Sequence, residues 1–519
     1  MEGRKEKATR NIIAGLIGQI ITMALSFVSR TVFLYCFTKE YVGISSLFSG
    51  IFSFLTLADL GMEASMTVRL YKPLALSDWS LLKTLLRYYR RIYNIIATVI
   101  FVAGLALLPF LNLIVDIPSE IENVQLIYVL MLLNTCVTYL FIYRKIVFVA
   151  DQKKYVTDIV QYCVTIIQYG VLIPLLLVTH SYVIYLLVQC GFQLLYNAII
   201  MILGKHKYNQ VDAALEAPFD TELRKNIKDD MIAISLHRIG DVVSTHSWTI
   251  LASSCISVVV AGMYSNYQLL IGYVKVFMDK VFYAISPSVG NMIVTEEKKT
   301  VYGFFNNMLF AAFVLTVFCG NCLLCLLNPF IRIWLTGSYL LPQTVVIVAI
   351  ISFFLTSMRK PVLIFKEAYG FFKNDKYRPL LESGINIAIS LGLCKVLGLG
   401  LEGILLGSVL SYLLSAFWIE PYILFKNGFR MKLGLYFKRY AIYAVFATSV
   451  FSLSATICHW VGPGIKGFLF SGVLCVLVTV GSIIVVFGRT NEFKWFSDIV
   501  LRVIKRFFKK TMKGETSND

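Results

Sequence analysis

The chain has 519 residues, of which 58% are hydrophobic and only 15% are charged. A soluble domain carries about 25% charged residues, and a helix needs roughly 20 apolar residues to cross a bilayer. Repeated apolar runs of that length exclude an ordinary soluble protein and predict a polytopic helical membrane protein. The formal net charge of +18 comes from basic residues dispersed among short loops, which is typical of membrane topology and argues against nucleic-acid binding.

The hydropathy pattern predicts about fourteen membrane-spanning helices. They cover residues 11–37, 42–67, 91–116, 125–149, 156–178, 181–204, 231–254, 256–288, 303–329, 341–366, 378–396, 400–425, 437–460 and 464–487. We expect an all-α integral membrane fold of two pseudo-symmetric six-helix lobes plus two C-terminal helices. The predicted parts are an N-terminal lobe at 1–204, a cytoplasmic linker at 205–230, a C-terminal lobe at 231–425, helices 13 and 14 at 426–490, and an amphipathic basic tail at 491–519.

Basic residues predict the orientation. With both termini in the cytoplasm, four basic residues fall on the outer side and two fall inside spans, which leaves 42 of the 48 on the cytoplasmic side, as the positive-inside rule requires. The outer four are Lys39, Arg332, Lys395 and Lys466. The two within spans are Arg30 and Arg238. A guanidinium inside a span is costly and usually faces partners, water or substrate.

Arg30 lies in the outer half of the first predicted helix. Asp59 and Glu63 follow in the second helix at a spacing of four, so they share a face and could approach Arg30. Arg30 is interpreted either as a contact for an anionic headgroup or as part of a static buried ion network. The two acids are interpreted as balancing or titrating groups, or as structural ones.

The seventh predicted helix is the least apolar, and it carries His237, Arg238 and Asp241 on one face. Such a face is expected to line a water-filled cavity between lobes or to form a buried salt bridge. The eighth helix carries Tyr264 and Asn266, which suit sugar contacts or helix packing. Further along, Lys275 and Asp279 are spaced as an i,i+4 pair, although Lys275 could instead snorkel to the interface.

Two short patterns are also notable. A faint repeat relates Val42–Ser46, at the start of the second helix, to Ala261–Ser265 in the eighth. Cys319, Cys322 and Cys325 recur every three residues, which predicts a stripe of small apolar side chains on one helix and no metal site or disulfide framework.

The tail after 491 has helical apolar spacing and a basic opposite face, which predicts a helix on the cytoplasmic leaflet or a frayed basic end.

No enzyme motif accompanies these features. The chain contains no Walker A sequence, no H-E-x-x-H and no G-x-S-x-G with triad partners. We therefore expect a transporter that requires no cofactor. A membrane-bound polysaccharide polymerase or ligase is a less favoured alternative, because the predicted outer loops are short.

Residues 41–80 carry a family resemblance. The matching positions are Tyr41, Gly43, Leu47, Phe48, Leu57, Ala58, Asp59, Leu60, Gly61, Tyr71, Lys72, Pro73, Leu74 and Ala75. This segment resembles the signature region of bacterial Wzx-type polysaccharide repeat-unit flippases of the multidrug/oligosaccharidyl-lipid/polysaccharide exporter superfamily. Glu63 departs from the family pattern, since an acid beside an anion site would repel phosphate unless it were paired or protonated.

The resemblance implies a V-shaped flippase that works by alternating access in the bacterial cytoplasmic membrane. It implies an undecaprenyl-pyrophosphate-linked oligosaccharide as substrate, for O-antigen, capsule or another polysaccharide, with the pyrophosphate held by Arg30 and Arg238. Partners would be membrane lipids, a polysaccharide polymerase and a chain-length regulator, around a monomeric chain. The alternative within the same superfamily is a multidrug or lipid II exporter.

Overall fold

The computed structural model describes residues 4–56, 62–111, 115, 118, 120–140, 142–218, 242–243, 246–335, 337–371, 375 and 377–515. Within these ranges the chain is almost entirely helical and contains no strand. Among the described residues, eleven helical segments are long and apolar enough to cross a membrane, and they correspond to eleven of the fourteen predicted spans. The other three are 42–67 and 231–254, which include residues outside these ranges, and the more polar 256–288.

The chain forms two compact units, Met1–Ser265 and Asn266–Asp519, which divide within helix α12. We refer to them as unit 1 and unit 2. The predicted linker at 205–230 lies partly outside the described residues, so the predicted lobe boundaries stay a prediction.

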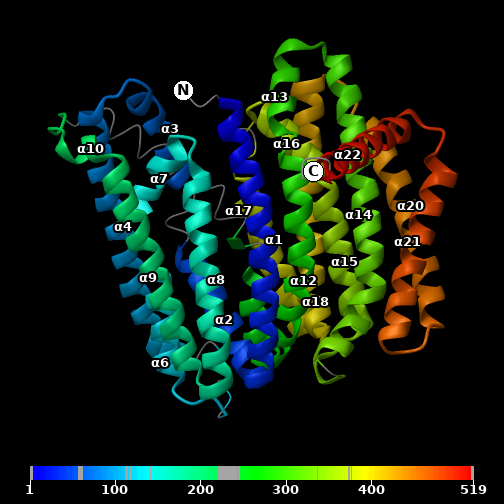
Figure 1. The fold of residues 1–519 in the computed structure, drawn as a ribbon. Helices are drawn as coiled ribbons and strands as arrows, with labels where there is room; N and C mark the ends of the chain where they lie inside the picture. Colours follow the sequence, from blue (N-terminus) through cyan, green and yellow to red (C-terminus); the bar gives the residue numbers. More distant parts are fainter. Residues whose placement is uncertain are drawn as a thin grey trace. The chain divides into compact units, whose positions relative to one another are not determined.

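Unit 1 is built of helices that pack side by side. They are α1 (Arg4–Cys36), α2 (Lys39–Leu55), α3 (Met62–Ala75), α4 (Trp79–Leu107), α6 (Val124–Val137), α7 (Ile142–Ala150), α8 (Lys154–Thr179), α9 (Tyr182–Lys207) and α10 (Asn209–Ala213), then helical residues 246–255 and the start of α12 (Val258–Tyr283). Helix α1 packs along α8, α8 along α9, and α9 along α6 (Figure 1). Val164, Tyr196 and Ile200 form the buried seam between α8 and α9.

The predicted span at 125–149 is divided into α6 and α7. A break inside a membrane frees backbone carbonyls that water cannot satisfy, so the protein must supply donors. Asn197, buried on α9, supplies one, because its Nδ2 donates to the carbonyl of Val137 at 2.7 Å. The break is therefore stabilised by a side chain sixty residues away, and span hydropathy gave no sign of it.

The segment after α10 is tied to the start of α4. Lys83 Nζ donates to the carbonyls of Asp212 and Ala214 at 2.9 and 2.7 Å. Arg87 pairs with Glu216, and its hydrogen bond lowers the pKa of that carboxyl. The first part of the predicted linker is thus fixed onto unit 1.

Unit 2 surrounds α14, whose 38 residues give a length of about 57 Å. Its helices are the rest of α12, α13 (Ser286–Thr295), α14 (Lys298–Leu335), α15 (Gln343–Met358), α16 (Lys360–Ala368), α17 (Arg378–Leu391), α18 (Gly400–Leu414), α19 (Ala416–Ile423), α20 (Gly434–His459), α21 (Ile465–Phe487) and α22 (Asn491–Glu515). Helix α14 packs against α15, α20 and α21, while α17 packs along α18 (Figure 1).

Residues 491–515 of the predicted tail form a helix, α22. Its first turns pack on unit 2, where the ring of Trp495 meets that of Phe304. Arg439 Nη1 donates to Glu492 Oε1 at 2.6 Å. Burial acts to raise the pKa of Glu492, but this bond and the charge of Arg439 bring it below its ordinary value. Contact of α22 with a lipid leaflet stays a prediction.

A buried ion cluster joins α15, α16, α17 and α19. It consists of three bases and three acids, namely Arg359, Lys366, Arg378, Asp375, Glu382 and Glu420. Glu420 is completely buried and accepts two bonds from Arg359, at 2.6 and 2.7 Å. Lys366 Nζ lies 2.6 Å from Asp375 and 3.1 Å from Glu420. From the sequence, these three bases indicate only the membrane topology. In unit 2, the three acids of the cluster balance their formal charge.

We expect Glu420→Gln to destabilise the protein. The substitution leaves three buried cations with two anions, and breaking a buried pair costs about 3–5 kcal/mol. The measurement is the melting temperature of the detergent-solubilised chain. Glu402→Gln is the matched control, since Glu402 accepts a bond from Thr344 Oγ1. Its free energy of unfolding should change by no more than about 0.5 kcal/mol. Equal melting temperatures for the two variants would contradict a stabilising role for the cluster.

Candidate functional site

Arg30 and Ser45 are brought to one level by the hairpin of α1 and α2. Helix α1 ends six residues after Arg30, at Cys36, and α2 begins six residues before Ser45, at Lys39. At 1.5 Å per residue, each position lies about 9 Å from the turn. The two side chains therefore occupy the same depth, in the half of unit 1 that the topology predicts to be outer.

A glycine crossing brings α12 against α2. A Cβ added to Gly262 would lie 2.7 Å from the backbone nitrogen of Gly43, and one added to Gly43 would lie 2.1 Å from the carbonyl oxygen of Val258. Only glycine allows such an approach at both positions. The two glycines are equivalent members of the faint repeat, so the repeat marks a contact surface, while the pseudo-symmetry of the lobes stays a prediction.

The crossing places Ser265, one turn beyond Gly262, beside Arg30. Arg30 Nη2 donates to Ser265 Oγ at 2.7 Å, and Ser265 in turn donates to the carbonyl of Gly262. The guanidinium also lies 6.0 Å from the centre of the Phe33 ring. It interacts electrostatically with the phenols of Tyr182 and Tyr185. Arg30 is half-buried, and its positive charge lies beside these two tyrosines.

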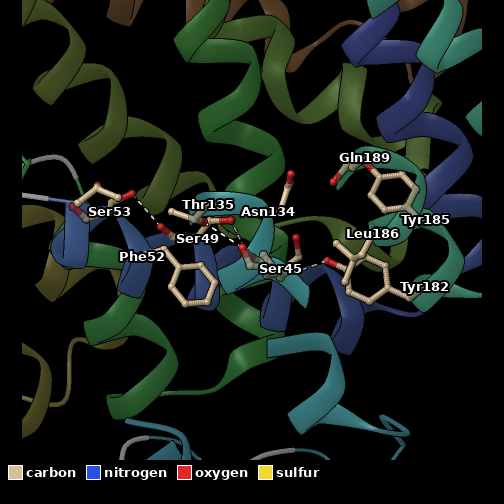
Figure 2. Close-up of a pocket in the computed structure, with 12 residues that line it drawn as sticks. Ser45, Ser49, Phe52, Ser53, Asn134, Thr135, Tyr182, Tyr185, Leu186 and Gln189 are labelled. Atoms are coloured by element: carbon tan, nitrogen blue, oxygen red, sulfur yellow. Dashed lines mark hydrogen bonds between the residues drawn. The ribbon is translucent and has the colours of Figure 1, made fainter. Parts of the chain in front are cut away.

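Those tyrosines belong to a polar cavity of about 370 Å³ in unit 1 (Figure 2). Its walls are Ser45, Ser49, Phe52, Ser53 and Thr56 of α2 and its end, Met131, Asn134 and Thr135 of α6, and Tyr182, Tyr185, Leu186 and Gln189 of α9. None of these described lining residues is charged. The volume falls within the range of small-molecule sites, about 300–1,000 Å³. We call this space the hydroxyl cavity.

The serines form a ladder along one face of α2. Ser49 Oγ donates to the carbonyl of Ser45 at 2.7 Å, and Ser53 Oγ donates to that of Ser49 at 2.8 Å. Since each of these hydroxyl protons is used within the helix, the oxygen lone pairs remain to accept bonds from a ligand. Asn134 and Gln189 add amides that both donate and accept. Such a wall suits a neutral ligand rich in hydroxyl groups.

Aromatic groups complete the cavity. Phe52, Tyr182 and Tyr185 present rings beside the ladder (Figure 2), and the hydroxyl of Tyr182 is hydrogen-bonded to Ser45. A flat apolar face next to hydroxyl acceptors matches a sugar ring, which has polar edges and an apolar face. The cavity is therefore chemically suited to sugar residues.

Four predicted site residues, Asp59, His237, Arg238 and Asp241, lie outside the described residues. Glu63 is on α3, which is a separate helix from α2, and its Oε1 lies 3.7 Å from Lys145 Nζ. The predicted span at 42–67, in which Asp59 was expected to begin a break, includes α2, which ends at Leu55, and the start of α3 at Met62. Glu63 thus has a basic neighbour, while its predicted approach to Arg30 stays a prediction.

The remaining predicted site residues lie along α12. Tyr264 is buried and packs edge-on against Trp248, with ring centres 4.8 Å apart. Asn266 is fully buried in unit 2. Asp279 pairs with Lys360 of α16 at 2.6 Å, while Lys275 interacts electrostatically with both groups. The expected i,i+4 pair is therefore part of a three-residue arrangement, and roles of these residues in transport stay predictions.

Sequence reasoning missed the serine ladder. Ser45, Ser49 and Ser53 recur every four residues, which is a visible polar stripe in an apolar helix. On α9 a second polar series, Tyr185, Gln189, Gln193 and Asn197, also recurs every four residues. The stripe was detectable, whereas the cavity that it lines was not.

No protein-family model and no curated protein matches this chain. Solved structures do match it. A structure of the lipid II flippase MurJ in an inward closed conformation has a TM-score of 0.64 at 13% identity and covers 94% of this chain and 99% of that one. An inward-facing multidrug resistance MATE family transporter of the MOP superfamily has a TM-score of 0.58 at 11% identity, with 79% and 98% covered.

A third similar structure is a mutant of the Vibrio cholerae MATE transporter VcmN, at a TM-score of 0.58 and 11% identity, covering 82% of this chain and 98% of that one. At such low identities these likenesses establish the fold. The chain therefore has the helical membrane fold that MATE transporters and MurJ share, which confirms the predicted fold class.

We expect Gly262→Ala and Gly272→Ala to change stability in opposite directions. The first adds a methyl group against the backbone of α2, and such overpacking costs about 1–3 kcal/mol. The second lies on the same helix with no atom within 4 Å of an added Cβ, so alanine's helix propensity should stabilise it by about 1 kcal/mol. Melting temperatures in detergent test this. A Gly262→Ala variant at least as stable as Gly272→Ala would exclude a tight crossing.

Proposed function

We propose that this protein is a flippase for a polyprenyl-pyrophosphate-linked oligosaccharide, undecaprenyl-linked in bacteria, which it moves from the inner to the outer leaflet of the cytoplasmic membrane. The observation that carries the proposal is the hydroxyl cavity, a neutral hydrogen-bonding wall with the cation of Arg30 at its edge. A lipid-linked oligosaccharide combines the matching groups, namely neutral sugars joined to an anionic pyrophosphate.

In this proposal each part of the substrate meets a different part of unit 1. The sugars occupy the hydroxyl cavity, where the serine oxygens accept their hydroxyl protons and the rings of Phe52 and Tyr185 contact their apolar faces. The pyrophosphate binds Arg30, which is suited to phosphate because its guanidinium offers several donors in a fixed plane. The polyprenyl tail stays in lipid. Arg238 is proposed as a second cation for the same group.

Two further observations support the proposal. The fold is that of MATE transporters and MurJ, and one of these known proteins is a flippase of a lipid. Residues 41–80 resemble the signature region of Wzx-type flippases, and the described part of that segment forms α2 and α3, which carry the serine ladder and Glu63. A multidrug exporter remains the alternative outcome of the experiments below, although the described lining of the cavity offers no acid to attract a cationic drug.

The first test is to delete the gene in the bacterium that carries it and to analyse the lipid extract by mass spectrometry. A flippase of this kind should leave complete, unpolymerised lipid-linked repeat units accumulated, and re-expression should remove them. The masses would also identify the sugars. Unchanged lipid-linked sugars together with greater sensitivity to cationic drugs would reject the proposal and indicate a multidrug exporter.

We expect Arg30→Ala to reduce polymer export by about 10- to 100-fold at unchanged protein abundance. The estimate follows from the loss of a charged hydrogen bond worth about 1.5–3 kcal/mol, at 1.4 kcal/mol per tenfold. Arg30→Lys should retain more export than Arg30→Ala because it keeps the charge. Arg489→Ala, at an exposed position after α21, is the control and should export normally. Normal export by Arg30→Ala would remove Arg30 from the mechanism.

A further inference from the structure

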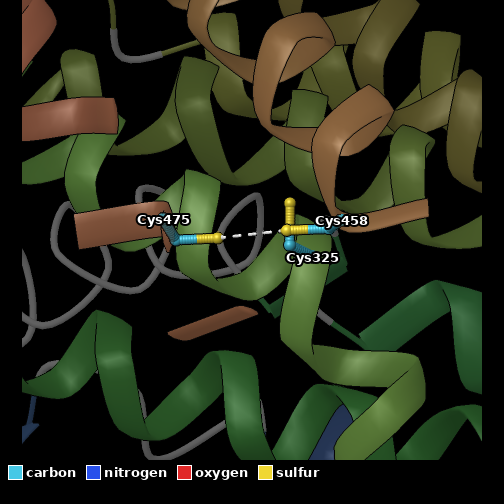
Figure 3. Close-up of side chains that lie close together, drawn as sticks. All are labelled: Cys325, Cys458 and Cys475. Carbon is cyan, nitrogen blue, oxygen red and sulfur yellow. Dashed lines mark hydrogen bonds between the residues drawn. The ribbon is translucent and has the colours of Figure 1, made fainter. Parts of the chain in front are cut away.

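Three cysteines that are far apart in the sequence meet inside unit 2. Cys325 of α14, Cys458 of α20 and Cys475 of α21 have sulfur atoms that all lie within 4.8 Å of one another (Figure 3). The sulfurs of Cys458 and Cys475 are 3.9 Å apart. None of the three forms a disulfide. We call this group the thiol cluster.

The helix register explains why these cysteines meet. One turn away, Asn321 of α14 donates to Ser454 of α20 at 2.8 Å and to Thr479 of α21 at 2.9 Å. Moving four residues along each helix from that layer reaches the thiol cluster, forward on α14 and α20 and backward on α21. The amide layer is fully buried, so it fixes the three helices at the spacing that the sulfurs share.

A cavity leads to the thiol cluster. Its volume is about 780 Å³, and Cys325, Cys458 and Ser471 line it together with residues of the turn between α20 and α21. That turn joins two candidate membrane-spanning helices, so the cavity opens at one end of these helices. Ser471 is hydrogen-bonded to Cys458. An ion from solution therefore has a route to two of the three sulfurs.

We propose that the thiol cluster binds a divalent thiophilic d10 cation of the zinc class. Soft thiolates select such ions, and a zinc–sulfur bond of about 2.3 Å gives a tetrahedral sulfur–sulfur edge of about 3.8 Å. The Cys458–Cys475 separation already fits that edge, and Cys325 has to move inward by no more than about 1 Å. Ser471 or water from the cavity completes four-coordination.

Charge favours a divalent over a monovalent ion. Three thiols bind the cation as thiolates and release three protons, so a divalent ion leaves a net charge of −1 and a monovalent ion leaves −2. Burying the larger charge at a low-dielectric site costs more. The sequence string Cys319, Cys322 and Cys325 is not the ligand set, because only Cys325 belongs to the cluster. The site is independent of the proposed transport function.

The test uses the purified full-length chain in detergent, reduced and freed of metal under anaerobic conditions, with Cd²⁺ as the probe. Cadmium–thiolate bonds absorb in the ultraviolet, so a titration gives both stoichiometry and affinity. We expect one Cd²⁺ per chain and at least a tenfold loss of affinity in Cys475→Ser. Cys322→Ser is the matched control on α14 and should bind like the unmodified chain. Melting temperatures report whether each variant folds.

A second measurement needs no substitution. Bound Cd²⁺ should protect Cys458 of the unmodified protein from a maleimide reagent, as peptide mass spectrometry would show. Absence of the cadmium band, equal affinity in Cys475→Ser, or unprotected Cys458 would each overturn the proposal. A Cys458–Cys475 disulfide that persists in the isolated protein after mild reduction would also overturn it and identify the cluster as a covalent link between α20 and α21.

Discussion

The structure depends on one constraint, that a polar group within the hydrocarbon must find its partner in the protein. The constraint explains where predicted spans break. Where α6 ends, the carbonyl of Val137 accepts from the backbone N–H of Leu140 and from the side chain of Asn197 on α9. It also explains why Arg359 and Glu420 are paired so completely, since either charge alone would be prohibitively costly to bury. Packing of helices in both units therefore follows the pairing of their polar groups.

Some polar groups in this protein form hydrogen bonds with one another, whereas others keep hydrogen-bond acceptors available for a ligand. In the ion cluster and in the Asn321 layer, hydrogen bonds and ion pairs run between helices, so these groups hold the fold together. In the hydroxyl cavity the serines donate within α2, and their acceptor capacity faces a space. The direction of the hydrogen bonds therefore distinguishes polar residues that stabilise the fold from polar residues that could bind a ligand. The polarity of the residues alone does not make this distinction.

The fold was predictable from sequence to the extent that it depends on local composition. Apolar runs indicated eleven spans that the structure contains, because crossing a membrane needs only length and hydropathy. Partners were not predictable, since they come from other helices. Arg359 and Arg378 looked like topology signals and are buried in ion pairs. Cys325 looked like one of three cysteines in a string, but its neighbours are Cys458 and Cys475. Glu63 was expected to approach Arg30, and Lys145 lies beside it.

The same constraint limits what this protein can hold in its hydroxyl cavity. A bare anion there would have to be neutralised by Arg30, and a bare cation would meet neutral oxygens beside a positive charge. A neutral polar body with one anionic end satisfies both elements, because the body binds the serine and amide wall while the charge is balanced by the guanidinium at its edge. Arg30 and Ser45 lie at one depth on adjacent helices, which under the proposed function suits a ligand whose charge lies next to its neutral body, as a pyrophosphate lies next to its sugar. The spacing thus favours a headgroup in which the first sugar follows directly after the charged link.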